Sequence, residues 1–213
     1  MSEIKTDKLI IVIGRQFGSG GRKLGKQLAE HYSLPYYDKE ILSKAAEKFG
    51  FSPEIFAKYD EKRPSLLRSL ISNTVGIQEI YSSHPLSSEG IYTAQSHVIR
   101  ELADAEGGVF VGRSADYILR DYPRLISIFL HSPLEKRAET LVGRGDSENL
   151  DKAKELAEKM DTKRENFYYY FTGRRWGHAD NYHFCMDSSL LDDESTFEVI
   201  KDFIDRRLDK SRL

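Results

Sequence analysis

Phosphate binding is the first chemistry that the residue types of this chain suggest. Residues 9–25 read LIIVIGRQFGSGGRKLG, in which an apolar run enters a glycine-rich bend and then a helical pattern that starts with basic residues. Glycines allow backbone N–H groups to turn toward a phosphate, and the start of the following helix adds partial positive charge. The candidate phosphate-binding residues are Arg15, Gly18, Ser19, Gly20, Gly21, Arg22 and Lys23.

The spacing of this bend departs from the two common glycine patterns for nucleotides. A strict P-loop has Gly, four residues, Gly, Lys and then Ser or Thr. Here Arg15, Gly21 and Arg22 stand where the first Gly, the Lys and the hydroxyl residue belong. Lys23 stands at the third glycine of the dinucleotide pattern. The alternative interpretation is an ordinary strand-to-helix turn that uses glycine for its backbone angles.

Length and composition limit the class of protein. The 213 residues suffice for a single domain over 1–213, and the net charge of -2 argues against a nucleic-acid partner. The single cysteine, Cys185, excludes an internal disulfide and a multi-cysteine metal site, and its apolar neighbours predict a buried thiol. The six histidines lack metal-ligand spacing, so we expect no metal held by a protein cluster.

The location that the sequence predicts is the cytoplasm. The first residues, MSEIKTDK, lack the apolar core of a signal peptide. No run reaches the roughly 20 apolar residues of a membrane span, so no membrane partner is expected.

Alternating strand and helix patterns must position the candidate residues. Helical segments separate the predicted strands, which favours an α/β fold with a parallel sheet, and ligands of such sheets bind beyond the carboxyl ends of the strands. We expect Ser132 to cap the helix over 133–142, and Asp146 or Ser147 to cap the helix that ends near 170. The predicted strands are 8–13, 35–37, 109–111, 125–130 and 182–186; the other predicted helices are 22–32, 39–49, 87–105, 115–120 and 194–208.

A set of segments runs through nearly the whole chain in a familiar order. They are GRQFGSGGRKLGKQLAE, LPYYDKEIL, VFVGRSADYIL, IFLHSPLEKRAE, a helix with Asp161 and Arg164, and NYHFCMDSSLL. This set resembles the cytidylate kinase-like family of P-loop nucleoside monophosphate kinases. The resemblance implies a P-loop NTPase-type three-layer α/β/α fold with a five-stranded parallel sheet. It also implies a helical arm for the monophosphate at 51–93, and a lid with its flanks at about 144–175.

The resemblance further implies ATP-dependent phosphoryl transfer to a nucleoside monophosphate, with CMP or dCMP preferred and Mg²⁺ accompanying ATP. The loop at 18–20 would hold the donor β-phosphate, and Ser19 could reach the Mg²⁺. The acceptor would contact Asp38, Lys44, Arg113, Asp161 and Arg164. The catalytic cations would be Arg22, Arg137, Arg144 and Arg164.

Departures from the family pattern keep a second function open. The P-loop Lys and hydroxyl are absent, and Ala157 and Lys39 stand where related enzymes have Arg and Ser. The loss of the P-loop Lys and hydroxyl favours the alternative of a catalytically weak, nucleotide-binding regulatory protein with the same fold. For Asp161 and Arg164, three residues apart on one helix, the structural alternative is an exposed ion pair worth about 0.3–0.5 kcal/mol.

Overall fold

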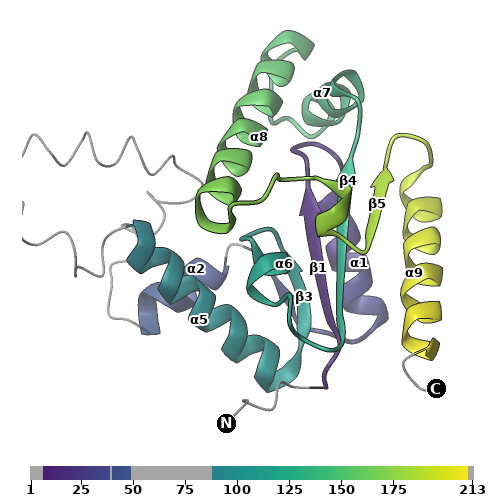
Figure 1. Cartoon of the computed structure of the whole chain (residues 1–213). Helices are drawn as coiled ribbons and strands as arrows, with labels where there is room; N and C mark the ends of the chain where they lie inside the picture. The colour runs from purple at the N-terminus through teal and green to yellow at the C-terminus, as the bar shows by residue number, and fades with distance from the viewer. Residues whose placement is uncertain (1–6, 39, 49–87, 211–213) are drawn as a thin grey trace, which may run out of the picture.

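A parallel sheet forms the centre of the protein (Figure 1). The computed structural model describes residues 7–38, 40–48 and 88–210. The five strands lie in the order β2-β3-β1-β4-β5, and every pairing is parallel. The strands are β1 (Ile10–Arg15), β2 (Tyr36–Tyr37), β3 (Gly108–Val111), β4 (Leu125–His131) and β5 (Phe184–Asp187). All five predicted strands and the predicted fold class are therefore confirmed.

Helices cover both faces of the sheet. They are α1 (Gly21–His31), α2 (Glu40–Lys48), α5 (Ser88–Glu106), α6 (Ala115–Ile118), α7 (Leu134–Gly143), α8 (Leu150–Thr172) and α9 (Asp193–Lys210), with a 3₁₀ turn η1 (Ala179–Asn181). The insertion predicted at 51–93 falls mostly outside the described residues, and its last part, 88–93, begins α5.

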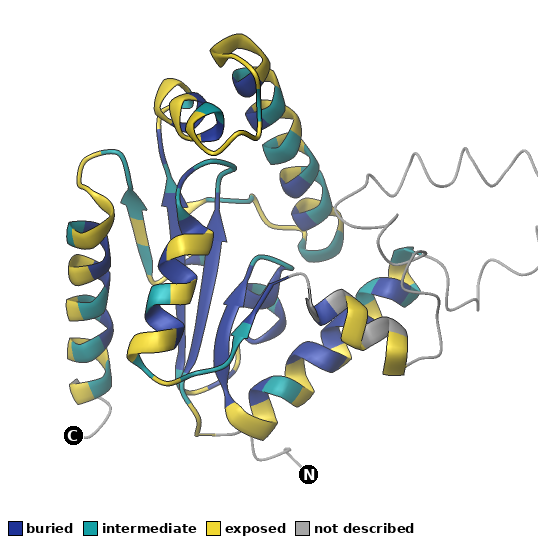
Figure 2. Ribbon diagram, turned by 180° about the vertical axis from the view of Figure 1, so that it is seen from behind, coloured by how far each residue is buried: buried dark blue, intermediate teal, exposed yellow. Residues whose placement is uncertain are grey.

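The core explains why residues 10–13 of β1 are all apolar. Ile10 and Val12 pack with α2, α5 and α6, whereas Ile11 and Ile13 pack with α1 and α9 on the other face. Successive side chains of a strand point to opposite faces, so a central strand covered on both sides must be apolar throughout. Figure 2 shows the buried strands between the two helical layers.

The predicted N-caps of α7 and α8 are wrong, because other residues hold the cap positions. The side chain of Asn149 accepts a hydrogen bond from the Lys152 N–H and caps α8 in place of Asp146 or Ser147. Asp146 instead forms an ion pair with Arg144. At α7 the cap position is Pro133, and the N–H of Ser132 donates to Gln16 Oε1 at 3.0 Å.

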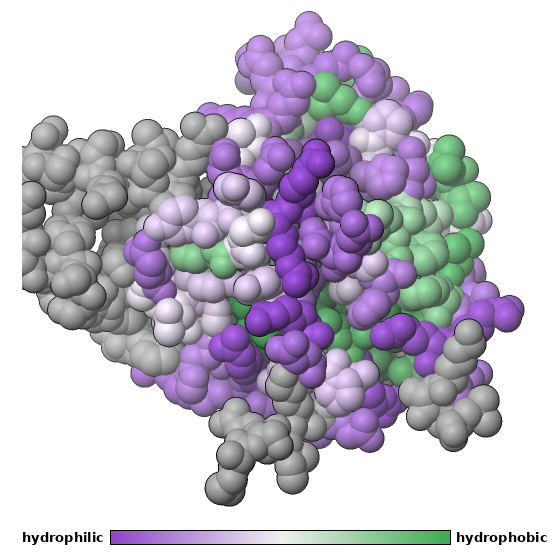
Figure 3. Space-filling view, viewed as in Figure 1, coloured by the Kyte–Doolittle hydropathy of each residue, from purple (hydrophilic) through white to green (hydrophobic). Residues whose placement is uncertain are grey.

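The predicted burial of Cys185 is also wrong. Its thiol is exposed. Phe184 and Met186 of the edge strand β5 pack against the core shared with α1 and α9, so Cys185 between them points to the opposite face. Figure 3 shows an apolar area over β5 and its connection to α9, where Leu190 and Leu191 are exposed by 75% and 41%. Apolar sequence around a cysteine thus does not distinguish a core strand from an edge strand.

Candidate functional site

The carboxyl ends of four strands bring the candidate residues to one edge of the sheet. Arg15 is the last residue of β1, and Asp38 and Arg113 lie in the segments that follow β2 and β3. Arg137 lies on α7, the helix that follows β4. The helices α7 and α8 pack together through Ala138, Leu141, Ala153 and Ala157 and stand over this edge (Figure 1).

The glycine-rich loop after β1 is held tightly against α7. Gly18 has φ of +91°, and a Cβ at this position would lie 3.0 Å from both the Cβ and the carbonyl oxygen of Arg137. Ser19 Oγ donates to the Gln16 carbonyl at 2.9 Å, and Ser19 is 4% exposed. Because Gly20 is the N-cap of α1, no side chain caps the first turn of that helix. This arrangement leaves backbone amides of a helix start facing the loop, as anion sites do.

The inward position of Ser19 does not fit direct Mg²⁺ binding. Its hydroxyl lies within hydrogen-bond distance of two main-chain carbonyls, that of Gln16 in the loop at 2.9 Å and that of Leu130 in β4 at 3.3 Å. No cluster of three or more His, Cys, Asp or Glu side chains that could hold a metal occurs in the described part of the chain.

Two of the three basic residues around this loop converge on one carboxylate. Arg22 Nε lies 2.7 Å from Asp38 Oδ2, and Arg15 Nη2 lies 3.7 Å from Asp38 Oδ1. Arg15 and Asp38 are buried, whereas the Arg22 side chain is 46% exposed. Lys23 instead contacts Asp193 Oδ2 at 2.5 Å, and this hydrogen bond and charge raise the Lys23 pKa. The structure brings Arg15 and Arg22 together and does not bring Lys23 to them.

Asp161 joins α8 to the loop after β1. The Phe17 N–H donates to Asp161 Oδ1 at 2.7 Å, and Arg137 Nη1 donates to Asp161 Oδ2 at 2.6 Å. Arg164 Nη1 lies 3.8 Å from Asp161 Oδ1 and donates to the Arg15 carbonyl at 3.1 Å. Burial raises the Asp161 pKa, while the Phe17 amide and the two arginines act against this rise.

This network excludes the exposed helix ion pair as the explanation of Asp161 and Arg164. Their side chains are 14% and 8% exposed, and both contact the loop far away in sequence. The Asp161 carboxylate, with donors on both oxygens, holds Arg137 and the Phe17 backbone in place. The sequence predicts that Asp161 also contacts the acceptor. An acceptor would then bind to a carboxylate that already accepts hydrogen bonds from Phe17 and Arg137.

The remaining predicted cations are more exposed. Arg144 forms an ion pair with Asp146 at 2.5 Å, and its guanidinium carbon lies 6.0 Å from the centre of the Phe17 ring. The exposed Lys44 lies on α2 with Nζ 5.7 Å from the centre of the Tyr37 ring. Arg144 therefore adjoins the loop after β1, whereas Lys44 adjoins the end of β2.

The loop after β3 has an unusual backbone. Gly112, Arg113 and Ser114 have φ of +74°, +62° and +52°, a conformation that non-glycine residues rarely adopt. The Arg113 carbonyl accepts a hydrogen bond from Gln95 Nε2 of α5 at 3.1 Å. We call residues 112–114 the Arg113 loop.

A buried carboxylate lies directly behind the Arg113 loop. Asp116 Oδ2 accepts a hydrogen bond from the Tyr168 hydroxyl of α8 at 2.6 Å. Burial raises the pKa of Asp116 to about 6, although the Tyr168 hydrogen bond opposes the rise.

Sequence reasoning missed Gln95, Asp116 and Tyr168 as site-supporting residues. A lone Gln or Tyr on a helix has no spacing that marks it. An Asp in the first turn of a helix is common for electrostatic reasons alone. The only available signal was the position of Asp116 three residues after Arg113.

Comparisons with known proteins find relatives over nearly the whole chain. A model of the cytidylate kinase-like family matches residues 10–190. Cytidylate kinases of Methanopyrus kandleri and Pyrococcus horikoshii are 26% and 25% identical over 205 and 201 residues. These alignments cover 95% and 93% of this chain, and 96% and 90% of the two relatives.

Solved structures show the same fold. An uncharacterized protein from Eubacterium ventriosum has a TM-score of 0.67 at 26% identity, with 93% of this chain and 99% of that chain covered. Shikimate kinase from Bacteroides thetaiotaomicron has a TM-score of 0.51 at 15% identity, with 96% and 99% covered. No described helix combines the length and apolar character that a membrane crossing requires.

Proposed function

This chain belongs to the cytidylate kinase-like family, and from that premise we propose that it transfers a phosphoryl group from ATP to a nucleoside monophosphate. We propose CMP or dCMP as the acceptor, and the name cytidylate kinase of the two relatives supports a cytidylate. The observation that carries the proposal is the network of Asp161, Arg137 and Arg164 on the loop after β1, because it gathers cations around a helix start.

Phosphoryl transfer needs alignment and positive charge more than covalent chemistry from the protein. In our proposal the loop at 16–20 and the start of α1 bind the donor phosphates of Mg²⁺-ATP, which enters as the substrate. Arg15 and Arg22 supply the charge that the P-loop Lys provides elsewhere. Lys23, which faces Asp193, has the smaller part.

The other cations act on the acceptor and on the transferred group. Arg113, with Asp38 and Lys44 nearby in the proposed acceptor site, binds the acceptor phosphate. Arg137, Arg144 and Arg164 stabilise the charge of the moving phosphoryl group. A guanidinium has five N–H donors, and the contacts of Arg137 within the described residues use only those on Nε and Nη1.

A regulatory nucleotide-binding protein is the second candidate. The observation in its favour is that Arg22, at the position of the usual hydroxyl residue, forms an ion pair with Asp38. In our proposal, turnover requires Arg22 to leave Asp38 and bind a phosphate of ATP. A protein that only binds nucleotides could keep the Arg22–Asp38 ion pair.

An assay of ADP release with Mg²⁺-ATP and each nucleoside monophosphate tests the proposal, run beside a thermal melting screen with the same nucleotides. We expect turnover with CMP or dCMP above all other acceptors. Stabilisation by nucleotides without turnover would favour the regulatory protein instead.

The Arg113→Ala variant tests the acceptor site in the same assay. We expect a raised acceptor KM or loss of turnover with the fold intact, because the acceptor phosphate loses its cation. Arg206→Ala, on α9 with Asp202 as its partner at 2.7 Å, is the control arginine. Normal phosphorylation of every acceptor by Arg113→Ala would remove Arg113 from the site.

A further inference from the structure

One face of α8 contacts both loops at the carboxyl edge of the sheet. Asp161, Arg164 and Tyr168 follow one another at intervals of three and four residues, the spacing that aligns side chains on one helical face. Asp161 and Arg164 bond to the backbone of the loop after β1, through Phe17 and Arg15. Tyr168 bonds to Asp116 behind the Arg113 loop.

We propose that Tyr168 and Asp116, together with Gln95, are positioning residues that fix the Arg113 loop relative to the loop after β1, with α8 as the spacer. This inference rests on the proposed function, in which the two loops hold the acceptor and donor phosphates. Seven residues of helix separate Asp161 from Tyr168, a rise of about 10 Å. The helix therefore sets the distance between its two points of attachment.

The Arg113 loop needs such support because its backbone is unfavourable on its own. Arg113 and Ser114 both have positive φ, and conformations of this kind persist only where the surroundings impose them. Gly112 packs so closely on Arg15 that a Cβ would overlap Arg15 Nη1. The loop thus packs on the side chain of the last residue of β1, directly before the loop after β1.

The supporting hydrogen bonds are shielded from water. Gln95, Tyr168 and Asp116 are 2%, 3% and 8% exposed. When a partner of a buried hydrogen bond is removed, water cannot readily replace it and the remaining group stays unsatisfied. Removal of one partner should therefore move or loosen the loop.

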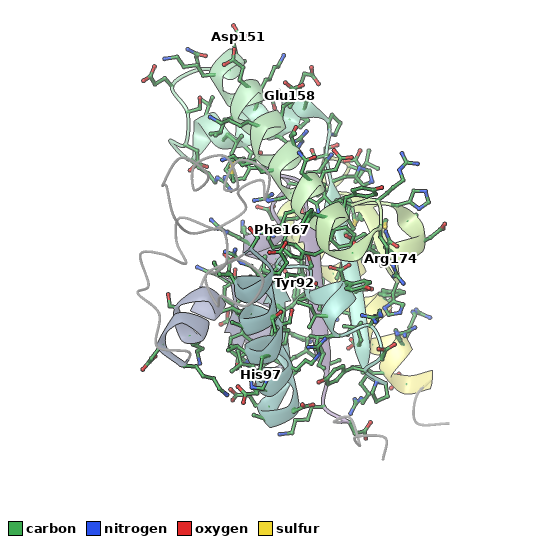
Figure 4. All side chains as sticks on the ribbon, turned by 60° about the vertical axis from the view of Figure 1, so that its left-hand side comes forward. Tyr92, His97, Asp151, Glu158, Phe167 and Arg174 are labelled. Carbon is green, nitrogen blue, oxygen red and sulfur yellow. The ribbon has the colours of Figure 1, made fainter. Side chains whose placement is uncertain are left out.

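The two supporting helices also pack on each other. The Tyr92 ring of α5 stacks on Phe171 of α8 with centroids 4.1 Å apart and planes 7° apart. Figure 4 shows Tyr92 and Phe167 side by side, and their ring centroids lie 6.0 Å apart. Gln95 and Tyr168 therefore hold the Arg113 loop from two helices that contact each other directly.

The variant Tyr168→Phe tests the proposal, with Tyr32→Phe as a matched control. Each variant loses a tyrosine hydroxyl that donates to a carboxylate. The Tyr168 hydroxyl lies 2.6 Å from Asp116, and the Tyr32 hydroxyl lies 2.7 Å from Asp205. Tyr32 is a control because it joins the end of α1 to α9 and not α8 to the Arg113 loop. We expect Tyr168→Phe to raise the acceptor KM about tenfold, the effect of one buried hydrogen bond, with the ATP KM within about twofold of wild type. Tyr32→Phe should change neither constant.

Rescue at Asp116 distinguishes positioning from general damage. Asp116→Asn keeps an oxygen that accepts from Tyr168 and should retain an acceptor KM near that of wild type. Asp116→Leu should behave like Tyr168→Phe. Equal effects of Tyr168→Phe on both substrates, or no effect on either, would overturn the proposal.

Hydrogen exchange tests the same tie without any turnover. In Tyr168→Phe the amides of residues 112–118 should exchange about tenfold faster than in wild type, and in Tyr32→Phe they should not. Unchanged exchange there would overturn the positioning role. A wild-type protein without turnover on any acceptor would instead refute the proposed function, and the exchange comparison would still decide the structural tie.

Discussion

Arg22 lies where a nucleotide phosphate and Asp38 would compete for it. Its Nε is 2.7 Å from the Asp38 carboxylate, and nearly half of its side chain is exposed. We expect Arg22→Ala to weaken ATP binding by about 1.5–3 kcal/mol, the range for a hydrogen bond to a charged group. Calorimetric titration measures this loss.

Lys23→Ala is the matched control, since Lys23 is adjacent in sequence but contacts Asp193. It should lose much less affinity for ATP. Unchanged affinity in Arg22→Ala would exclude Arg22 from the site and leave Arg15 or an arginine of the α7–α8 region to supply the charge.

Asp116 gives the stability of the protein a specific pH dependence. Its pKa rises from an ordinary 3.8 to about 6 on burial, so the native state holds a proton that the unfolded chain has lost between these values. The contribution of Asp116 to stability is therefore greatest below pH 4 and falls as the pH rises to about 6.

Urea unfolding of wild type and Asp116→Asn between pH 4 and 7 measures this contribution. The Asn side chain does not titrate, so the variant should gain stability relative to wild type as the pH increases. A constant difference between the two proteins across this range would show that the Asp116 carboxyl does not titrate in it.

In the Arg113 loop, Gly112 combines a positive φ with direct packing on Arg15. We expect Gly112→Ala to lower the free energy of unfolding by about 1–3 kcal/mol, because a Cβ meets both obstacles. Gly143→Ala is the control, since Gly143 ends α7 and a Cβ there meets no described atom within 4 Å. Urea unfolding that gives equal stabilities for the two variants would contradict the role of Gly112.

The sequence was sufficient to predict the strands whose apolar residues are buried in the core. Residues 10–13 of β1 are all apolar, and β4 is apolar except for Ser127 and His131, because both faces of the sheet are covered. Such runs predict buried parallel strands. Helix ends were harder to predict, since Asp146, Ser147 and Asn149 are all good caps. Asp146 pairs with Arg144 and the Ser147 hydroxyl donates to the Asn149 carbonyl, while the Asn149 side chain caps α8.

The sequence predicted that the candidate residues lie at one edge of the sheet. It did not predict which side chains contact one another there. Chain order fixes that Arg15, Asp38 and Arg113 follow strands. Which carboxylate each arginine contacts depends on side-chain packing between segments far apart in sequence, as in the bond from Phe17 to Asp161. Pairing of Tyr168 with Asp116 has no sequence signature for the same reason.

Across the protein, the ties of α8 limit which parts can move when nucleotides bind. We expect a bisubstrate nucleotide to protect the proposed arm at 51–93 and the segment at 144–160 from hydrogen exchange. Residues 161–168 should change less, because they are already bonded to the two loops. The amides of α9 serve as the control, and absence of protection in both proposed segments would contradict closure.

The position of β1 in the middle of the sheet also affects how the protein is made. Ile10 pairs with Gly108 on one side and with Leu125 on the other. A ribosome adds about 5–20 residues each second, so β1 waits roughly 5–25 s for both neighbours to be synthesised. During this interval the apolar residues 10–13 lack one or both of the strands that flank them in the sheet. Nascent chains that stop before β4 should therefore aggregate or bind chaperones, whereas those that include β4 can enclose β1.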